Sequence, residues 1–136
     1  MATKKVRDIM ILKVRTLRRS DSLQLASDLM TQGHIRHFPV MDGGKVVGVV
    51  SERDLFRASL SSLVKYGEKE EKAFRDTVSI KGVVNEPAIT VSPDASIQEA
   101  ARMLLEHRIG CLPVVEGDKL QGLVTGRDIL RALIEN

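Results

Sequence analysis

The sequence is short of the residues that mark several common classes of protein. One cysteine in 136 residues rules out a disulfide within the chain, which is typical of a reducing compartment. Three phenylalanines, one tyrosine and no tryptophan are too few for an aromatic platform that stacks single-stranded nucleic acid. No apolar run approaches the roughly twenty residues of a membrane helix, and no apolar signal region follows the first five residues. We therefore expect a cytoplasmic protein without a membrane segment.

The charge of the chain is also close to balanced. It has 21 Lys and Arg against 18 Asp and Glu, a net charge of +3, which is too weak to indicate a nucleic acid partner. The basic residues near the N-terminus are interpreted as a solvated surface; they are Lys4, Lys5, Arg7, Arg15, Arg18 and Arg19. A chain of this length can bury about two-thirds of its unfolded surface, enough for a real core.

One pattern occurs twice in the chain, at a constant offset that matches Asp54 with Asp128. It runs without a gap from Val6 and Ile80 to Ala58 and Ala132, and such self-similarity decides how a fold is interpreted. Each copy contains a strand, a glycine turn, a second strand and a helix that begins after a hydroxyl residue. Apolar identities between the copies are what any shared core requires. A shared core does not require identical charged residues just past a strand. The copies nevertheless share two such pairs, Arg53/Arg127 and Asp54/Asp128.

The periodicity predicts the order β-α-β-β-α in each copy. The predicted segments are extended runs at 14–17 and 88–91, helices after Ser22 and Ser96, hairpins at 38–50 and 112–124, and closing helices at 52–63 and 126–134. Gly33 is the expected end of the first helix. Neither repeat can cover its own sheet, so we predict an α/β (α+β) fold in which the two repeats pack with pseudo-two-fold symmetry.

The predicted domains are residues 1–63, a helical charged linker at 64–78, and residues 79–136. The linker contains the charged run 68–72, interpreted as a solvated helix face, and a short amphipathic turn around Ala73 and Phe74.

Two interpretations compete for the hydroxyl-x-Arg-Asp run that the copies share. Ser51 and Thr125 stand at the N-cap of a helix, where a hydroxyl is worth about 1 kcal/mol of stability. The same place can hold a phosphate, because a helix N-terminus offers free N–H groups and the arginine adds a charge-assisted bond. The aspartate three residues on can accept from ribose hydroxyls or can complete the cap. Its occurrence in both copies favours the ligand site.

These residues carry a resemblance to a known family. The lead-ins, the Ser-Pro-Asp turn at 92–94 and the runs 34–40, 48–54 and 122–128 resemble the cystathionine-β-synthase (CBS) domain, here as a tandem pair. The resemblance covers about 6–63 and 79–136. It implies a pseudo-symmetric pair with two clefts for adenosine-containing ligands: AMP, ADP or ATP, and in some members S-adenosylmethionine or NAD. Members of the family commonly form flat dimers and act as regulatory sensors.

The resemblance also implies which residues bind. The family's Gly-h-h-Ser/Thr-x-x-Asp run supplies ribose and phosphate contacts, which here are Ser51, Arg53 and Asp54 in one cleft and Thr125, Arg127 and Asp128 in the other. Each cleft is completed by the opposite repeat: Thr90, Ile109 and Gly110 face Asp54, and Thr16, Ile35 and Arg36 face Asp128. Ile35 and Ile109 are the expected contacts of the base. No other cofactor is implied.

Catalysis and metal binding have weaker support. His34 and His37 are three residues apart and Cys111 aligns with His37, but no carboxylate or further thiol completes a metal ligand set. Nothing resembles an orienting group or an oxyanion hole beside Cys111. We predict no metal and no enzymatic activity. We expect a regulatory adenine-nucleotide sensor that acts as a homodimer on a separate effector protein; the alternatives are a ligand-free protein-interaction or dimerisation module and a binder of S-adenosylmethionine or NAD.

Two further expectations concern surfaces. The closing helices are expected to leave apolar positions such as Leu55, Leu130 and Leu133 for a dimer contact. The Asp128 cleft is expected to bind phosphate more tightly than the Asp54 cleft, because Gly126 leaves the helix N–H groups open where the first copy has Glu52. Arg36 adds a positive charge to the same cleft.

Overall fold

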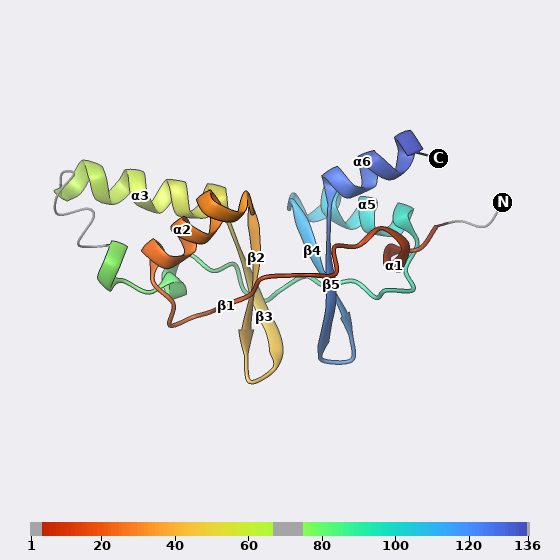
Figure 1. Cartoon of the computed structure of the whole chain (residues 1–136), viewed down its shortest axis with the longest axis horizontal. Helices are drawn as coiled ribbons and strands as arrows, with labels where there is room; N and C mark the ends of the chain where they lie inside the picture. Colours follow the sequence, from red (N-terminus) through yellow and green to blue (C-terminus); the bar gives the residue numbers. More distant parts are fainter. Residues whose placement is uncertain (1–3, 67–74, 136) are drawn as a thin grey trace. The chain divides into compact units, whose positions relative to one another are not determined.

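The structure is a computed structural model that describes residues 4–66 and 75–135. Its elements (Figure 1) follow the predicted order in the first repeat and, apart from the first strand, in the second; a short helical turn opens each repeat. They are α1 (Val6–Ile9), β1 (Leu17–Arg18), α2 (Leu23–Gly33), β2 (His37–Asp42), β3 (Lys45–Ser51), α3 (Glu52–Tyr66), η1 (Ile80–Gly82), α5 (Ile97–His107), β4 (Cys111–Glu116), β5 (Lys119–Thr125) and α6 (Gly126–Glu135). The mixed α/β fold predicted from the sequence is confirmed.

The strands of the first repeat form a three-stranded sheet in the order β1-β2-β3. β1 pairs with β2 in parallel, with Leu17 opposite Val40. Val49 of β3 forms a single antiparallel bridge with Asn85. The strand predicted at residues 14–17 therefore lies slightly later in the sequence, at Leu17–Arg18.

The second repeat has the same kind of pairing at the matching positions. β4 and β5 are antiparallel, with Cys111 opposite Thr125. Val91 bridges Val114 in parallel, and Ile11 bridges Leu123 antiparallel. The extended run predicted at 88–91 is thus reduced to a single bridge, because only Val91 reaches the β4 backbone.

The two hydrophobic cores match at every position but one, since the counterpart of the buried Leu23 is the partly buried Ile97. The first contains Leu17, Leu23, Ala26, Met30, Phe38, Val40, Val50, Leu55 and Ile80. The second contains Val6, Val91, Ala100, Leu104, Leu112, Val114, Val124 and Ile129. Val6 begins the first repeat but lies in the second core, and Ile80 begins the second repeat but lies in the first. The lead-ins are exchanged between the repeats.

The exchange makes the compact units discontinuous in sequence. One unit contains the described residues before Arg15, Gly44–Val46, and those from Ala88 onward; the other contains the described parts of Arg15–Gly43 and Val47–Pro87. The sequence domains 1–63, 64–78 and 79–136, and the pseudo-two-fold packing of the repeats, stay predictions.

Helix ends and turns follow the local chemistry of the sequence. The Ser22 hydroxyl accepts from the Leu25 N–H, and the Ser96 hydroxyl accepts from the Glu99 N–H. The prediction that Gly33 ends α2 is confirmed: Gly33 is the last helical residue, and the left-handed cap that follows is His34. The φ angles of Gly43 and Gly44 are +58° and +82°, a conformation that glycine adopts freely.

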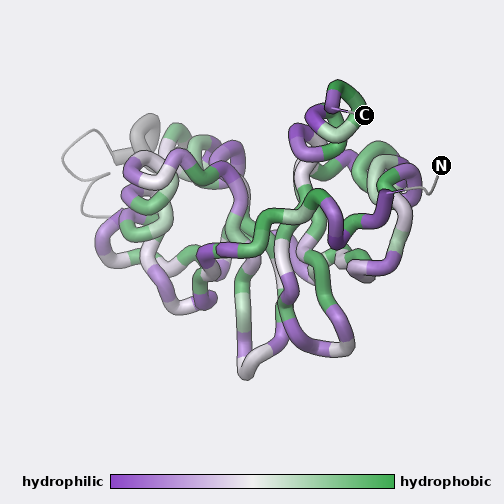
Figure 2. The backbone as a smooth tube through the Cα atoms, turned by 45° about the vertical axis from the view of Figure 1, so that its right-hand side comes forward, coloured by the Kyte–Doolittle hydropathy of each residue, from purple (hydrophilic) through white to green (hydrophobic). Residues whose placement is uncertain are grey.

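The first closing helix continues past the repeat, as predicted, and reaches Tyr66. The charged run 68–72 and the turn at 73–74 lie outside the described residues. Figure 2 shows hydrophobic and hydrophilic residues alternating along the helices, which is the pattern of amphipathic helices with one face on a core. Within 4–66 and 75–135, no helix is long and apolar enough to cross a membrane.

Candidate functional site

The first candidate site is the N-terminus of α3. The Asp54 Oδ2 atom accepts from the Ser51 backbone N–H at 2.8 Å and from the Ser51 hydroxyl at 2.7 Å. The Asp54 N–H lies 3.2 Å from the Ser51 Oγ atom. This is a reciprocal capping box, in which the hydroxyl and the carboxylate each satisfy backbone groups at the helix end.

The second candidate site, at the N-terminus of α6, has the same geometry. Asp128 Oδ2 accepts from the Thr125 N–H and the Thr125 hydroxyl, each at 2.8 Å, and the Asp128 N–H lies 3.2 Å from the Thr125 Oγ1 atom. Asp128 is the one charged residue among the buried positions of the described chain, with 7% of its surface exposed. Both hydroxyl-x-Arg-Asp runs therefore adopt the same local structure, a capping box at the start of a helix.

The first turns of α3 and α6 each keep one backbone N–H available. The Glu52 N–H donates to the Arg36 carbonyl at 2.8 Å, and the Gly126 N–H lies 3.4 Å from the Gly110 carbonyl, longer than a usual bond. The N–H groups of Arg53 and Arg127 have no acceptor among residues 4–66 and 75–135. Both arginine side chains are exposed, and neither forms an ion pair in that part of the chain. Each helix end thus presents a free N–H and a free guanidinium.

The cap occupies only one oxygen of each carboxylate. Every hydrogen bond to Asp54 and Asp128 in the described chain ends on Oδ2. Asp128 Oδ1 lies 3.8 Å from an Arg131 guanidinium nitrogen, a loose ion pair. The cap interpretation and the ligand interpretation are therefore compatible, because Oδ1 can still accept from a ribose hydroxyl.

The remaining predicted site residues lie at the start of the strands. Thr16, Arg36 and Gly110 are exposed, and Ile35, Thr90 and Ile109 are half-buried. Within each repeat the backbone hydrogen bonds bring Arg36 to Glu52 and Gly110 to Gly126. The expected pairing of these residues with the aspartate of the opposite repeat stays a prediction.

One residue near the first site escaped the sequence reasoning. The Asn85 side-chain amide donates to Asp54 Oδ2 at 3.0 Å. The constant offset between the copies places Ile11 at the same position for the second site. Ile11 and Asn85 differ in polarity, but so do Leu12 and Glu86 beside them, so the sequence carried no signal specific to Asn85.

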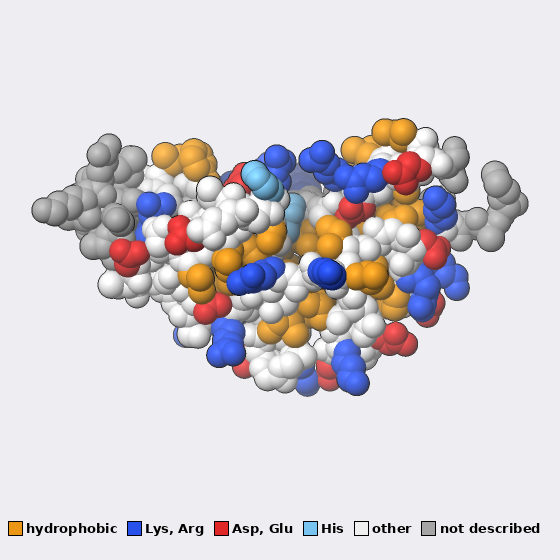
Figure 3. All heavy atoms as spheres, in the orientation of Figure 1, with side chains coloured by type: hydrophobic (Ala, Val, Ile, Leu, Met, Phe, Trp, Pro, Cys, Tyr) orange, Lys and Arg blue, Asp and Glu red, His pale blue; other side chains and the backbone are white. Residues whose placement is uncertain are grey.

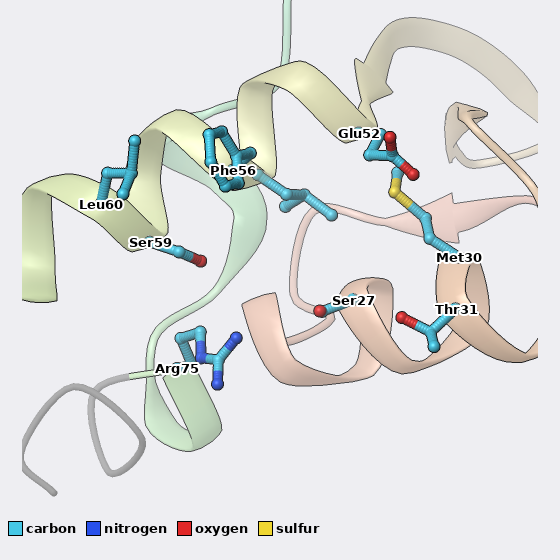
Figure 4. A pocket seen from close by; sticks show the side chains of 9 residues that line it. Ser27, Met30, Thr31, Glu52, Phe56, Ser59, Leu60 and Arg75 are labelled. Carbon is cyan, nitrogen blue, oxygen red and sulfur yellow. The ribbon is translucent and has the colours of Figure 1, made fainter. Parts of the chain in front are cut away.

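The surroundings of Glu52 and Gly126 also differ. A Cβ built on Gly126 meets no atom within 4 Å, so the space beside this helix end is open. The Glu52 side chain lies beside Met30 at a cavity of about 340 Å³ between α2 and α3 (Figure 4). Its charge stays at the first turn of α3, where it competes with an anion for the helix N-terminus.

Cys111 and His37 stand at equivalent repeat positions; Cys111 is buried and His37 is half-buried. Burial raises the pKa of the Cys111 thiol to about 12, so the thiol stays protonated at neutral pH and is a poor nucleophile. Burial lowers the pKa of His37 from its ordinary value, against the opposing charge of Asp54.

The comparison with protein families decides what these repeats are. The model of the CBS domain matches residues 6–61 and again residues 80–135. The chain belongs to the CBS domain family. The two matched segments are the repeats whose cores and helix caps are described above, so the resemblance noted in the sequence is confirmed.

Several proteins resemble the whole CBS pair. The uncharacterized protein MJ1404 of Methanocaldococcus jannaschii is 37% identical over 99% of this chain and 33% of its own length. Inosine-5'-monophosphate dehydrogenase of Korarchaeum cryptofilum is 33% identical over 94% of this chain and 24% of its own. The chain therefore spans about a third or less of these two relatives, and the enzyme is a much longer chain than the CBS pair it shares.

Solved structures cover the chain over nearly its full length. AcuB from Vibrio cholerae has 34% identity and a TM-score of 0.77, with 98% of this chain and 93% of that chain covered. The structure of CBSX2 in complex with AMP has 28% identity and a TM-score of 0.77, with 96% of each chain covered. The CBS-pair architecture is thus shared with a protein that holds AMP.

Proposed function

We propose that this CBS pair is a regulatory sensor of an adenine nucleotide, AMP, ADP or ATP, without catalytic activity of its own. The observation that carries the proposal is the pair of matching helix ends. Each presents a free Arg N–H, an exposed guanidinium and an uncommitted carboxylate oxygen. An adenine nucleotide needs these three groups, two for phosphate and one for the ribose hydroxyls.

The proposed contacts follow from that division. Arg53 and Arg127, with the N–H groups beside them, bind phosphate oxygens. Asp54 and Asp128 accept from the ribose through Oδ1, while Oδ2 keeps the cap. Thr16, Ile35, Arg36, Thr90, Ile109 and Gly110 complete the two sites. The AMP held by CBSX2 supports an adenosine-containing ligand for a CBS pair of this similarity.

A ligand panel tests the proposal. Protein stripped of carried-over ligand is titrated by calorimetry with AMP, ADP, ATP, S-adenosylmethionine and NAD. We expect at least one adenine nucleotide to bind with a dissociation constant well below a millimolar, which corresponds to about −4 kcal/mol. Tighter binding of S-adenosylmethionine or NAD would change the ligand and keep the sensor. Absence of binding by all five would refute the sensor.

The alternative is a CBS pair that only dimerises and docks on another protein. The complete capping boxes favour it, because they explain both aspartates without a ligand. It predicts that Asp128→Ala lowers the melting temperature and that no nucleotide raises it. A nucleotide-dependent rise in the parent protein that disappears in Asp128→Ala would exclude it, since a ligand stabilises only the state that binds it.

We also propose a homodimer that uses the exposed apolar side chains of α5 and α6. These are Leu105, Leu130, Leu133 and Ile134, with exposed fractions between 61% and 84%, and orange side chains gather over α6 in Figure 3. The expectation for Leu55 was wrong. It is 5% exposed and belongs to the first core, and Phe56 and Leu60 are the exposed residues of α3. Sedimentation at micromolar concentration should give a species near twice 15.0 kDa; a monomer would contradict the dimer.

A further inference from the structure

We infer that Asn85 is a positioning residue for the ligand site at Asp54, and that the second site has no counterpart of it. The inference rests on the proposed function and deepens it, because it names a residue that makes the two sites unequal. Asn85 belongs to the lead-in of the second matched CBS segment, yet its side chain serves the first.

The contact itself is a hydrogen bond to the carboxylate that the ligand is proposed to use. The Asn85 Nδ2 atom lies 3.0 Å from Asp54 Oδ2 and 3.4 Å from the Val49 carbonyl oxygen. Asp54 Oδ2 therefore accepts from three donors, the N–H and hydroxyl of Ser51 and the amide of Asn85. Three donors on one oxygen fix the plane of the carboxylate and leave Oδ1 to face an incoming hydroxyl group.

The backbone holds Asn85 firmly enough for this role. Its N–H donates to the Val49 carbonyl at 2.9 Å, and the Val49 N–H donates to the Asn85 carbonyl at 3.1 Å. The chain passes so close to Gly48 that a Cβ there would lie 2.6 Å from the Asn85 carbonyl oxygen. These contacts fix the backbone position of Asn85, and its short side chain reaches Asp54 from that position.

The second repeat reproduces this backbone and lacks the amide. The Ile11 N–H donates to the Leu123 carbonyl at 2.8 Å, and the Leu123 N–H donates to the Ile11 carbonyl at 3.0 Å. A Cβ on Gly122 would lie 2.6 Å from the Ile11 carbonyl oxygen, the same value as at Gly48. Ile11 thus occupies the place of Asn85, but its side chain cannot donate, and within the described residues Asp128 Oδ2 has only the two donors from Thr125.

The test measures the Asp54 site alone, in an Asp128→Ala background, by titration with AMP. We expect Asn85→Ala to weaken AMP binding roughly five- to tenfold, as for the loss of one ordinary hydrogen bond. Asn85→Asp should weaken it further, because it keeps the shape of the side chain and sets a second negative charge beside Asp54. The melting temperature without ligand should change little in Asn85→Ala, because the residue is exposed.

The mirror variant provides the matched control. Ile11→Asn in an Asp54→Ala background should give the Asp128 site the missing donor and strengthen AMP binding several-fold. Unchanged affinity in Asn85→Ala, with AMP still bound by the background protein, would overturn the inference and leave the proposed function standing. Absence of AMP binding by the background and by the parent protein would overturn the inference for AMP, and absence of binding of all five ligands of the panel would overturn the proposed function with it.

A second measurement needs no ligand. The NMR shifts of the Asn85 side-chain amide should move in Asp54→Ala and stay unchanged in Asp128→Ala. Shifts that stay unchanged in both variants would show that the amide does not contact Asp54, which would overturn the inference.

Discussion

The helix ends at Ser51 and Thr125 have the same three hydrogen bonds with closely matching lengths, yet their surroundings differ. The first has Glu52 in its first turn and the Asn85 amide on its aspartate. The second has Gly126, open space beside it, and Ile11 in place of the amide. The shared hydrogen bonds cap the helix, as the fold requires. The neighbouring residues that differ can make the two ligand sites unequal.

The comparison extends to the lead-ins that the repeats exchange. Asn85 and its neighbours pass over Gly48, and Met10 and Ile11 pass over Gly122. Both glycines are needed because a chain crosses at contact distance. The side chains packed against the two glycines differ in flexibility. A methyl group of the rigid Val84 side chain lies at Gly48, whereas the flexible thioether of Met10 lies at Gly122.

The largest expected effect comes from filling these crossings. Gly48→Ala should lower the free energy of unfolding by about 3 kcal/mol and Gly122→Ala by about 2 kcal/mol, because added atoms in a packed crossing force the backbone apart. Urea unfolding of both variants measures the difference.

Gly82→Ala is the matched control, since a Cβ there meets nothing within 4 Å. It should leave the stability unchanged or raise it slightly. Equal and small losses at Gly48 and Gly122 would contradict the exchanged lead-ins.

A smaller effect should separate the two caps. Ser51→Ala and Thr125→Ala should each cost about 1 kcal/mol, with the greater loss at Thr125. The reason is that Asp54 keeps the Asn85 amide when the hydroxyl is lost, whereas the buried Asp128 keeps only one backbone donor.

The double variant Ser51→Ala/Asn85→Ala sharpens this prediction. It should approach the cost of Thr125→Ala in thermal unfolding. A larger loss for Ser51→Ala alone would reverse the order of the two caps.

The smallest expected effect is a pH dependence of stability that His37 causes and its counterpart Cys111 does not. The pKa of His37 is lowered in the folded protein, so on acidification the unfolded chain takes up the proton first. Stability should therefore fall as the pH drops below the ordinary histidine pKa of about 6.5 and level off below the lowered value. Cys111 does not titrate in this range, because its pKa is about 12.

Thermal unfolding at a series of pH values between neutral and mildly acidic measures this slope. His37→Gln should flatten it. A slope that is the same in His37→Gln would assign the acid sensitivity to other groups.

Much of the fold could be predicted because the repeat supplies two copies of the same evidence. The caps at Ser22 and Ser96, the hairpin glycines and the closing helices followed from local chemistry. The exchange of Val6 and Ile80 did not, because an apolar residue in a lead-in fits either core and the choice depends on the path of the chain between them.

The geometry of the two helix ends was predictable to a similar degree, whereas their use as ligand sites stays a prediction. The duplicated Asp54 and Asp128 identified both helix ends from the sequence alone. Asn85 did not follow, because its contact with Asp54 depends on a backbone crossing from a distant part of the chain. The burial of Leu55 was also not predicted. The helical pattern fits either Leu55 or Phe56 as the residue that faces the core, and only the position of the core decides between them.

The most direct test of the account compares Asp54→Ala with Asp128→Ala, each titrated with ATP by calorimetry at fixed ionic strength. The two helix ends are proposed as ligand sites that bind phosphate unequally, because Glu52 stands in the first turn of one and Gly126 in the first turn of the other. The account predicts that both variants lose a binding event and that Asp128→Ala loses the tighter one. A larger loss in Asp54→Ala would reverse the order of the sites, and unchanged ATP binding in both variants would contradict the central claim.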